Sequence, residues 1–458
     1  MTSKEGNMNR QRIVFSPVTR ISGLLTVELS VEDACIMDAR ACCTMFRGYE
    51  AIMRGRHVTD AVYLTQRVCG ICSTAHGAVA SYLLDALYDN DIDENAQYIR
   101  NIMLGADFLQ NHIRHFYLFE LPDYVVMPDR PPFLAQNCSD CRFDEGDNTI
   151  IAGHYHGAIQ AAARSHQLLT LFGGKAPHQH SFVHGGAAVA PTADIITQAS
   201  FLLRDIRDFV QRCMLPDTEA ISQRYDDYYH IGETSGRMLS FGLFRFDEKN
   251  GNPLWKGGVL DNGRISAVDL EDIAEDVTHA WFRQSGPGET EPTPRKPGAY
   301  TWTKAVQYGG RHCEGGPLAR MLINGYYNGG TSVMDRIMAR SLETYLITEL
   351  MTAWLTKLKP GPAPISQKKE TAVRQATAVT DAMRGPLLHS ATVADGSVTR
   401  YDIITPTGWN FSPKDEHGRR GPVETALAGT VMPSPALAYM VAGRIIRSFD
   451  PCIACATH

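Results

Sequence analysis

Apolar residues recur at helical spacing along several long stretches of the chain. Between residues 96 and 119 they return every three to four positions, at Ile99, Met103, Ala106, Leu109 and Ile113. This is the stripe by which a helix packs against a core. The same spacing predicts further helices over residues 60–88, 154–172, 193–214, 331–359, 367–383 and 436–446. The pattern therefore predicts a mainly helical protein.

Shorter stretches alternate apolar and polar residues and predict strands. Residues 13–33 do so on both sides of a turn signal at Ser22 and Gly23, and residues 398–406 predict one more short strand. Residues 251–270 combine turns with short strands, and residues 283–300 form a loop dense in proline and glycine. The expected fold class is α+β, predominantly α, with small strand pieces near the termini.

Length and charge exclude several classes of protein. A chain of 458 residues is compatible with about three domains by length alone. The net charge of −6 and the absence of a basic run argue against a nucleic-acid partner. No run approaches 18 apolar residues, so we expect no membrane span. The polar first 15 residues lack the apolar core of a signal peptide. We therefore expect a cytoplasmic protein, or one exported or membrane-associated through a partner's signal.

The chain contains eleven cysteines, an odd number for a long chain with few loops. A disulfide scaffold fits this usage poorly, and metal or redox chemistry fits it better. Six of the cysteines form CxxC pairs, namely Cys69/Cys72, Cys138/Cys141 and Cys452/Cys455. For a lone pair such as Cys138/Cys141, incidental cysteines are the preferred interpretation.

The first and last pairs have a spacing that suits one shared metal ion. Thiolates at positions i and i+3 lie on one face of a turn, so two pairs can supply four ligands. Structural zinc and an iron–sulfur cluster are the default interpretations of four thiolates. The two pairs lie near opposite ends of the chain, however, which is more typical of an active site assembled by a whole fold. Metal binding would also hold in place a terminus that otherwise frays.

The motifs around these pairs resemble the large subunit of nickel–iron hydrogenases. RVCGICSTAH (67–76) is similar to the family's N-terminal cysteine motif, and DPCIACATH (450–458) to its C-terminal one. Further matches follow in family order: FRGYE (46–50), HFY (115–117), GGKAPH (173–178), EGGPLAR (314–320), RGPLLH (384–389) and TPTGWN (405–410). The resemblance extends from Pro17 to the last residue. It implies one unit over 1–458, with the hydrogenase large-subunit fold and a core of long bundled helices.

The resemblance implies which residues bind the metals. Nickel would be bound by Cys69, Cys72, Cys452 and Cys455, with Cys72 and Cys455 also bridging to an iron that carries carbon monoxide and cyanide. Thiolates are soft ligands suited to both metals. Dihydrogen is a very weak acid, so its cleavage needs a metal to polarise it and a base to accept the proton. Cys452, a terminal thiolate, is the candidate base, and Asp450 is a further candidate catalytic residue.

Several polar residues are expected around the cluster. The resemblance places Arg384 over the open metal position, near one cyanide, and the Pro406 backbone and Thr407 hydroxyl at the other. His76, four residues after Cys72, would reach a bridging sulfur. From the residues alone, a surface ion pair for Arg384 and a core position for His76 remain open.

The last residue has an expected role of its own. The resemblance implies that His458 binds magnesium together with Glu50 and the backbone carbonyl of Ile403. Carboxylate and carbonyl oxygens suit this ion, whereas a histidine ligand is less usual for it. Family members are commonly made with an extension that is removed after this histidine. A chain ending here is the processed form or a member that never had one.

The chain departs from the usual family pattern at several positions. Ser22 stands where many members have a glutamate that accepts the proton, and Asn111 stands where an aspartate is common. KAVQY (304–308) replaces KAPRY, and Met383 replaces a proline. These departures put the proton route in question but leave the four cysteines intact.

Two bulky residues are candidates for a gas channel. Ile71 and Phe119 occupy positions where many oxygen-sensitive relatives have valine and leucine, so they would narrow a path to the metals. Plain core packing is the equal alternative for both.

The implied activity is reversible heterolytic cleavage of dihydrogen, in the uptake direction, with electrons passed to an iron–sulfur small subunit in a heterodimer. Lys175 and His178 are candidates for that contact, with a polar interface rim as the equal alternative. Association of heterodimers into a higher oligomer is a further expectation. A hydrogen sensor that signals to a kinase is the alternative function. A complex-I-like subunit would lack the four cysteines, and a structural zinc protein is a minor alternative.

Overall fold

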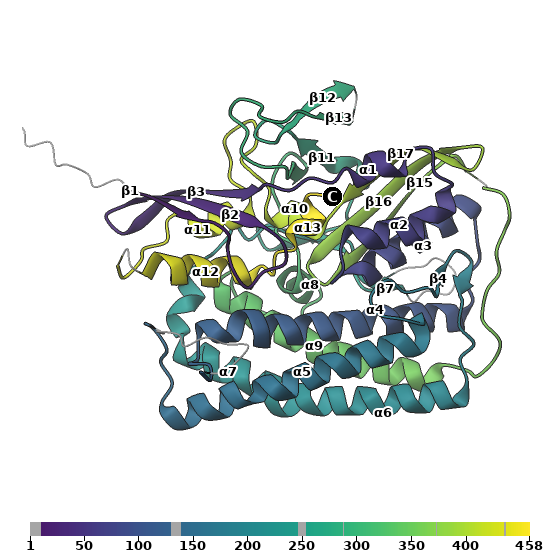
Figure 1. The fold of residues 1–458 in the computed structure, drawn as a ribbon, viewed down its shortest axis with the longest axis horizontal. Helices are drawn as coiled ribbons and strands as arrows, with labels where there is room; N and C mark the ends of the chain where they lie inside the picture. Colours follow the sequence, from purple (N-terminus) through teal and green to yellow (C-terminus); the bar gives the residue numbers. More distant parts are fainter. Residues whose placement is uncertain (1–10, 130–138, 246–252, 287, 372, 435–436) are drawn as a thin grey trace, which may run out of the picture.

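The computed structural model describes residues 11–129, 139–245, 253–286, 288–371, 373–434 and 437–458. Its largest feature is a layer of four long helices, which lie side by side in Figure 1. These are α4 (Glu94–Arg114), α5 (Glu145–Gly173), α6 (Ala193–Phe209) and α9 (Val333–Lys357). Most of α4 is buried, as expected for a central helix that packs on several neighbours.

The ends of these helices are capped by their own sequence. Ser332 and Asp335 form a capping box at the start of α9. Asp93, Asp144 and Thr192 accept backbone N–H groups at the starts of α4, α5 and α6. Such caps satisfy N–H groups that have no partner within the helix.

Two of the three three-stranded antiparallel sheets in the described part of the chain lie above this helical layer in Figure 1. One contains β1 (Gln11–Phe15), β2 (Leu25–Glu32) and β3 (Cys35–Cys43). The other contains β15 (Gln375–Ala382), β16 (Gly385–Ala394) and β17 (Ser397–Ile404). The alternating burial of β2 shows that one face of the first sheet is packed and the other partly exposed.

Shorter elements complete the described part of the chain. The helices are α1 (Tyr49–Met53), α2 (Ala61–Thr65), α3 (Ser73–Tyr88), α7 (Leu215–Arg224), α8 (Pro317–Ile323), α10 (Pro406–Asn410), α11 (Pro422–Leu427), α12 (Ala438–Ser448) and α13 (Ile453–Ala456). The strands are β4 (Phe182–Val183), β5 (Gly186–Ala187), β6 (Met238–Ser240), β7 (Leu243–Arg245), β8 (Pro253–Trp255), β9 (Gly258–Asp261), β10 (Arg264–Ser266), β11 (Ile273–Asp276), β12 (Phe282–Gly286), β13 (Glu289–Pro292) and β14 (Ala305–Tyr308).

Short 3₁₀ and π turns link several of these elements. They are η1 (Val58–Asp60), η2 (Gln66–Val68), η3 (His115–Glu120), η4 (Leu121–Asp123), η5 (Val210–Met214), η6 (Asp226–His230) and η7 (Leu270–Asp272). None of the described helices combines the length and the apolar composition that crossing a lipid bilayer requires.

The predicted fold class is confirmed, since helices account for more of the described chain than strands do. The helices expected over 331–359 and 193–214 are present, the second continuing through η5 as a π turn. Strands are not restricted to the ends of the chain, because β4 to β14 occupy its middle. The strand β3 was not predicted.

The helix expected over 60–88 is interrupted between Thr65 and Ser73, where Cys69 is extended. Two other predicted elements were wrong. Residues 367–383 were expected to be helical, but Gln375–Ala382 is the strand β15, fully paired with β16. The loop expected over 283–300 is partly a hairpin, in which β12 pairs with β13 through Arg283 and Glu291. In both cases pairing with a neighbouring strand outweighs a local signal for helix or loop.

A buried network of charges ties the helical layer to the second sheet. Arg320 on α8 forms ion pairs with Glu343 on α9, at 2.6 Å, and with Asp381 on β15, at 3.1 Å. His112 on α4 contacts the same Glu343 at 2.8 Å. All four side chains are fully or almost fully buried. Because a buried charge that loses its partner is strongly destabilising, this network fixes α4, α8 and β15 relative to one another.

Candidate metal centre

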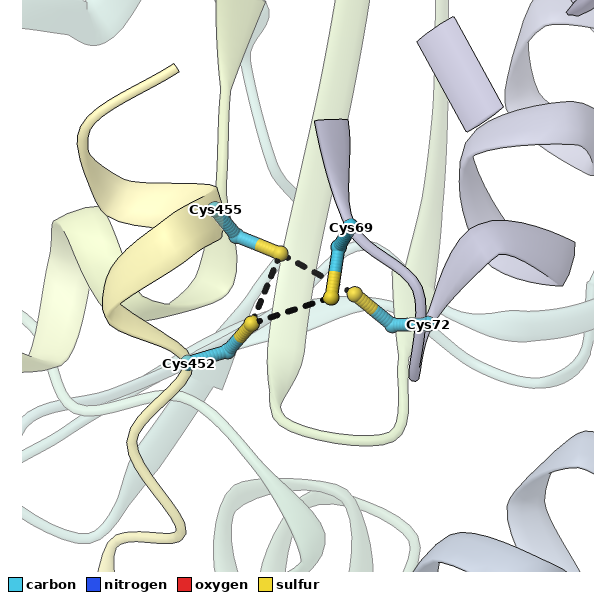
Figure 2. A group of neighbouring side chains, drawn as sticks. All are labelled: Cys69, Cys72, Cys452 and Cys455. Atoms are coloured by element: carbon cyan, nitrogen blue, oxygen red, sulfur yellow. Dashed lines mark hydrogen bonds between the residues drawn. The ribbon is translucent and has the colours of Figure 1, made fainter. Parts of the chain in front are cut away.

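The structure brings the first and last cysteine pairs together. The sulfur atoms of Cys69, Cys72, Cys452 and Cys455 all lie within 4.8 Å of one another. The distances are 3.3 Å from Cys69 to Cys452, 3.0 Å from Cys72 to Cys455 and 3.0 Å from Cys452 to Cys455. Figure 2 shows the two pairs facing each other, one from each of two separate segments. All four cysteines are buried.

Local backbone structure positions each pair. Cys69 lies in extended backbone after η2, and Cys72 is the N-cap of α3. Cys452 is the N-cap of the short helix α13, and Cys455 lies on its single turn. Each pair therefore occupies a sharp bend at a helix start, which directs both sulfurs to one side.

Arg47 joins the two segments that carry the pairs, and Ser22 holds the second segment in place. The guanidinium of Arg47 donates to the carbonyl of Val68, at 2.5 Å, and also to the carbonyl of Ala454. Ser22 forms a parallel bridge with Cys452, in which Ile453 N–H donates to the Ser22 carbonyl at 2.8 Å. Arg47 belongs to the FRGYE motif, but nothing in its sequence pattern indicated this role.

The sulfur cluster favours one negative charge on Cys452. Hydrogen bonds from Cys455, Cys69 and Cys72 hold the pKa of Cys452 well below its usual value, and the nearby Arg384 adds to this. The pKa values of Cys72 and Cys455 are raised. Four thiols crowded this closely share few charges until a metal ion replaces their protons. The geometry and the donor type fit a soft metal centre with four thiolates.

A buried cation and carboxylate lie beside the cluster. Arg384 donates through Nε to the Asp450 carbonyl, at 2.8 Å, and through Nη2 to the Asp450 carboxylate, at 3.0 Å. Its Nη1 reaches the side-chain oxygen of Asn111 at 3.3 Å. Because Arg384 is only 4% exposed, the surface ion pair considered for it is excluded. All three guanidinium nitrogens of Arg384 are hydrogen-bonded, so Asp450 and Asn111 set the orientation of this side chain.

A small cavity of about 10 Å³ borders the sulfurs. Its lining is mostly apolar and includes His76, Pro406, Thr407, Arg384 and three of the cysteines. The Thr407 hydroxyl accepts the Cys452 N–H at 3.0 Å, so its own hydrogen can point into the cavity. A space of this size holds about one water-sized molecule.

His76 is buried beside the cluster, and its Nδ1 pairs with Nε2 of His389 at 3.1 Å. His389 continues to the Tyr401 hydroxyl at 2.9 Å. Burial lowers the pKa of His76 to about 3, so this imidazole is neutral. The sequence suggested a contact from His76 to a sulfur, whereas the hydrogen bond seen in the structure goes to His389.

The chain end lies against Glu50 and strand β17. His458 Nε2 is 3.6 Å from a Glu50 carboxylate oxygen, and the Ile403 N–H donates to the same oxygen at 3.0 Å. These residues line a cavity of about 30 Å³ together with Lys304 and Glu275. Burial alone would raise the pKa of Glu50, but Lys304 and His458 outweigh it and lower the pKa to about 2. The three expected magnesium ligands are therefore brought together around an ionised carboxylate.

The other predicted residues, Ser22, Ile71 and Phe119, each make a different contact. Ser22 Oγ is 3.9 Å from the Cys452 sulfur. The Ile71 carbonyl accepts from Asn111 at 2.8 Å, and the Phe119 carbonyl accepts from Arg20 at 2.8 Å. Both Ile71 and Phe119 are partly exposed, and their role in a gas path stays a prediction.

The candidate partner contact and the middle cysteine pair are less defined. Lys175 and His178 are partly exposed, and the His178 N–H donates to Ser73 at the start of α3. Cys138 lies outside the described residues, so the interpretation of Cys138 and Cys141 stays a prediction.

Four converging thiols in a buried site, joined by a fold of the whole chain, define a thiolate-ligated metalloenzyme subunit. The family model described as nickel-dependent hydrogenase matches residues 47–129, 136–331 and 326–458. The chain belongs to this family, and it is the large subunit of a nickel–iron hydrogenase.

Individual relatives agree with this assignment. The chain is 33% identical to the periplasmic [NiFeSe] hydrogenase large subunit of Desulfomicrobium baculatum, over 98% of this chain and 95% of that protein. It is 27% identical to the hydrogenase-2 large chain of Escherichia coli K12, over 98% and 97%. The reduced Ni-Fe-Se hydrogenase of D. vulgaris Hildenborough superposes with a TM-score of 0.94 at 34% identity, covering 98% of this chain and all of that one.

Proposed function

We propose that this subunit catalyses the reversible heterolytic cleavage of dihydrogen, in the uptake direction, at a nickel–iron centre held by Cys69, Cys72, Cys452 and Cys455. The observation that carries the proposal is the buried four-sulfur cluster, bordered by a guanidinium and a small apolar cavity. One relative, 28% identical and from Rhizobium leguminosarum bv. viciae, is named as an uptake hydrogenase large subunit, and this name supports the direction.

The metal ligands are assigned as the family resemblance implies. Cys69 and Cys452 would hold nickel alone, and Cys72 and Cys455 would hold both nickel and iron. When bound, the metals would supply the polarisation that makes dihydrogen acidic enough to lose a proton. Arg384 and Thr407 bring N–H and O–H donors to the adjoining cavity, which suits cyanide ligands that accept hydrogen bonds, and Pro406 lines the same cavity.

The protein's own groups handle the proton and exclude water. Cys452 is the first base, because a terminal thiolate keeps lone pairs free for a proton. Arg384 holds a fixed positive charge beside it, oriented by Asp450 and Asn111. The cavity is too small for bulk water, so charges within it interact strongly.

A magnesium ion completes the proposal at the chain end. Glu50, His458 and the Ile403 carbonyl would hold it, with water in the remaining positions. The Lys304 ammonium is 3.8 Å from the Glu50 carboxylate, so it would compete with magnesium for that negative charge. The ion would fix α13 against β17 and so support the last cysteine pair.

Oxidation of dihydrogen releases electrons, and the four cysteines assigned to nickel and iron do not carry them away from the site. We therefore propose an iron–sulfur small subunit as the partner in a heterodimer, with Lys175 and His178 near the contact. The large-subunit relatives support this partner. One relative is named as periplasmic, and export through the partner's signal is compatible with that name.

The ligand assignment is tested by Cys452→Ser. A serine hydroxyl is a hard, weakly acidic ligand, so we expect bound nickel to fall about tenfold or more and hydrogen oxidation to be lost. Nickel and iron per protein are measured by elemental analysis of the purified heterodimer. Cys213→Ser is the matched control, because this half-buried cysteine lies outside the cluster, and it should keep both metals. Full nickel and activity in Cys452→Ser would contradict the assignment.

A further inference from the structure

A second group of buried polar residues lies directly behind Asp450. It consists of His115 and Glu120 from η3, Arg340 from α9, and Asp450 itself. His115 Nε2 is 3.7 Å from an Asp450 oxygen, and His115 Nδ1 is 3.4 Å from a Glu120 oxygen. Arg340 Nη1 is 3.6 Å from the other Glu120 oxygen. Each of the four side chains is nine-tenths or more buried.

The polar atoms of this group are largely without hydrogen bonds. In the described part of the chain, they include both carboxylate oxygens of Glu120, Nδ1 of His115, Nε and Nη1 of Arg340, and one oxygen of Asp450. Buried polar atoms in folded proteins are normally satisfied by protein groups or by ordered water. Six such atoms gathered at one place mark a buried polar group whose hydrogen-bonding capacity the surrounding protein leaves largely unused.

The hydrogen bonds fix the protonation of His115. Its Nε2 is 2.8 Å from the Arg447 carbonyl, which can only accept, so Nε2 carries the hydrogen. Burial lowers the pKa of His115 well below its usual value, so the ring is neutral and Nδ1 is an acceptor. An unprotonated nitrogen 3.4 Å from a Glu120 oxygen would repel a carboxylate but can accept from a carboxylic acid. This arrangement therefore favours a protonated Glu120.

The charges around Glu120 agree with a protonated carboxyl. Burial raises its pKa to about 8, the cation of Arg340 acts against this, and the carboxylates Asp450 and Asp123 add to it. Arg447 is a further cation that lowers the pKa. A group with a pKa this close to neutral can both hold and release a proton.

On its other side, Glu120 approaches a cavity that reaches the surface. Asp123, three residues further on, is paired with Arg447 and Arg20. These three residues line a cavity of about 210 Å³, together with the exposed ring of Tyr439. Asp123 stays ionised, because both arginines lower its pKa against the effect of burial. Glu120 therefore has Asp450 and His115 on its metal-centre side, and it is near Asp123 and Arg447, which line an open, charged cavity.

We propose that Glu120 is a proton-relay residue, which takes up protons from the metal-centre side and releases them to water in the cavity lined by Arg20, Asp123 and Arg447. In the release step the Glu120 O–H bond breaks, and a water molecule on the cavity side becomes hydronium. In the uptake step the carboxylate accepts a proton from hydronium on the Asp450 side, which returns to water. His115 is a positioning residue that orients the carboxyl. The inference rests on the proposed function, since it concerns the protons which that reaction releases.

The protonation state of Glu120 is tested by infrared spectroscopy, which does not depend on enzymatic activity. The purified protein is labelled with ¹³C-carboxyl glutamate. Wild type should show a carboxylic acid band that disappears as pH rises through about 8. This band should be missing in Glu120→Gln. Glu424→Gln is the matched control, because Glu424 is also buried and burial raises its pKa to about 7. That control should lose a different band. A Glu120 that is ionised at pH 6 would overturn the proposal.

The relay itself is tested by two gas reactions of the loaded heterodimer. Conversion of para- to ortho-dihydrogen needs the metal centre but no exchange with solvent protons, whereas exchange of D₂ with solvent needs the proton route. In Glu120→Gln we expect D₂ exchange to fall about tenfold or more, with para–ortho conversion retained within about twofold. Glu424→Gln should leave both reactions unchanged. Wild-type D₂ exchange in Glu120→Gln would overturn the relay.

Para–ortho conversion and D₂ exchange distinguish failure of the relay from failure of the proposed function on which it rests. If wild type converts no para-dihydrogen, the proposed function fails, whatever Glu120 does. If the Glu120→Gln protein does not fold, the infrared titration of labelled wild type still decides. A single glutamic acid band, lost in Glu424→Gln, would then show that Glu120 holds no proton and would overturn the relay.

Discussion

Ser22 is the residue at which the proton route of this chain differs most from what the family resemblance implies. Its hydroxyl is 3.9 Å from the Cys452 sulfur, and its backbone binds the same segment through Pro451 and Ile453. A hydroxyl can pass a proton on but cannot hold one as a carboxylate does. The group suited to hold a proton is instead Glu120, on the far side of Asp450.

This difference predicts that an acceptor at residue 22 can replace the relay. Ser22→Ala should leave D₂ exchange within about twofold of wild type, because the proposed route does not pass through the hydroxyl. Ser22→Glu should restore much of the exchange lost in Glu120→Gln, since it supplies a carboxyl near Cys452. Both are measured by mass spectrometry of HD formation. Ser16→Glu, at an exposed position, is the control and should restore nothing. A large loss in Ser22→Ala would place the route at the hydroxyl instead.

At the scale of elements, the long helices could be predicted because each has a continuous apolar stripe. The strand β15 could not, because its sequence fits two periods. Ala372, Ala376, Val379 and Met383 have helical spacing, while Ala378, Thr380 and Ala382 alternate as in a strand. All three alternating residues are buried in β15. Pairing with β16 decides between the periods, and that pairing is a tertiary contact that local pattern does not contain.

Some residues of the candidate site could likewise be predicted from the sequence, and others could not. The four cysteines, Arg384 and Glu50 lie in motifs whose spacing is specific, and the structure brings each group together. Glu120, Arg340 and Arg447 carry no such signal, because each is a single charged residue within a helical pattern. Their proximity depends on how η3, α9 and α12 pack, so only the fold reveals it.

The turn between β1 and β2 predicts a test of how elements hold the last cysteine pair. Gly23 has φ +96°, and an added Cβ would lie 2.9 Å from the Ile453 Cβ and 3.0 Å from the Ala454 nitrogen. Gly23→Ala should therefore push α13 away, destabilise the protein by about 1–3 kcal/mol and lower its nickel content. The free energy of unfolding and the nickel per protein are measured together.

Gly298→Ala is the control for this variant. Gly298 also has a positive φ, +78°, but an added Cβ would meet no atom within 4 Å. It therefore carries the backbone strain of a left-handed residue without the contact on α13. If both variants retain nickel equally, the packing of Gly23 on the cysteine segment has no part in building the site.

At the scale of the whole molecule, the site joins segments that are far apart in the chain. Cys69 and Cys452 are separated by 383 residues, yet their sulfurs are 3.3 Å apart. The N-terminal sheet, the start of α3 and the end of the chain meet at this point, above the helical layer (Figure 1). A metal ion bound here acts as a cross-link between them. It stabilises only the folded arrangement, because an unfolded chain does not present four converging thiolates.

This geometry predicts that nickel protects the joined segments locally. Hydrogen exchange of the backbone amides of Ile71, Ile453 and Cys455 should be about tenfold slower or more in nickel-loaded than in nickel-free protein. Tenfold corresponds to about 1.4 kcal/mol of added stability against local opening. Helix α5 supplies the internal control, since it contributes no sulfur and should exchange equally in both forms. Cys69→Ser protein grown with nickel should resemble the nickel-free form. Nickel in the loaded wild-type protein is confirmed by elemental analysis. If these amides exchange at the same rate in nickel-loaded and nickel-free protein, the fold holds the cysteines together without help from the metal.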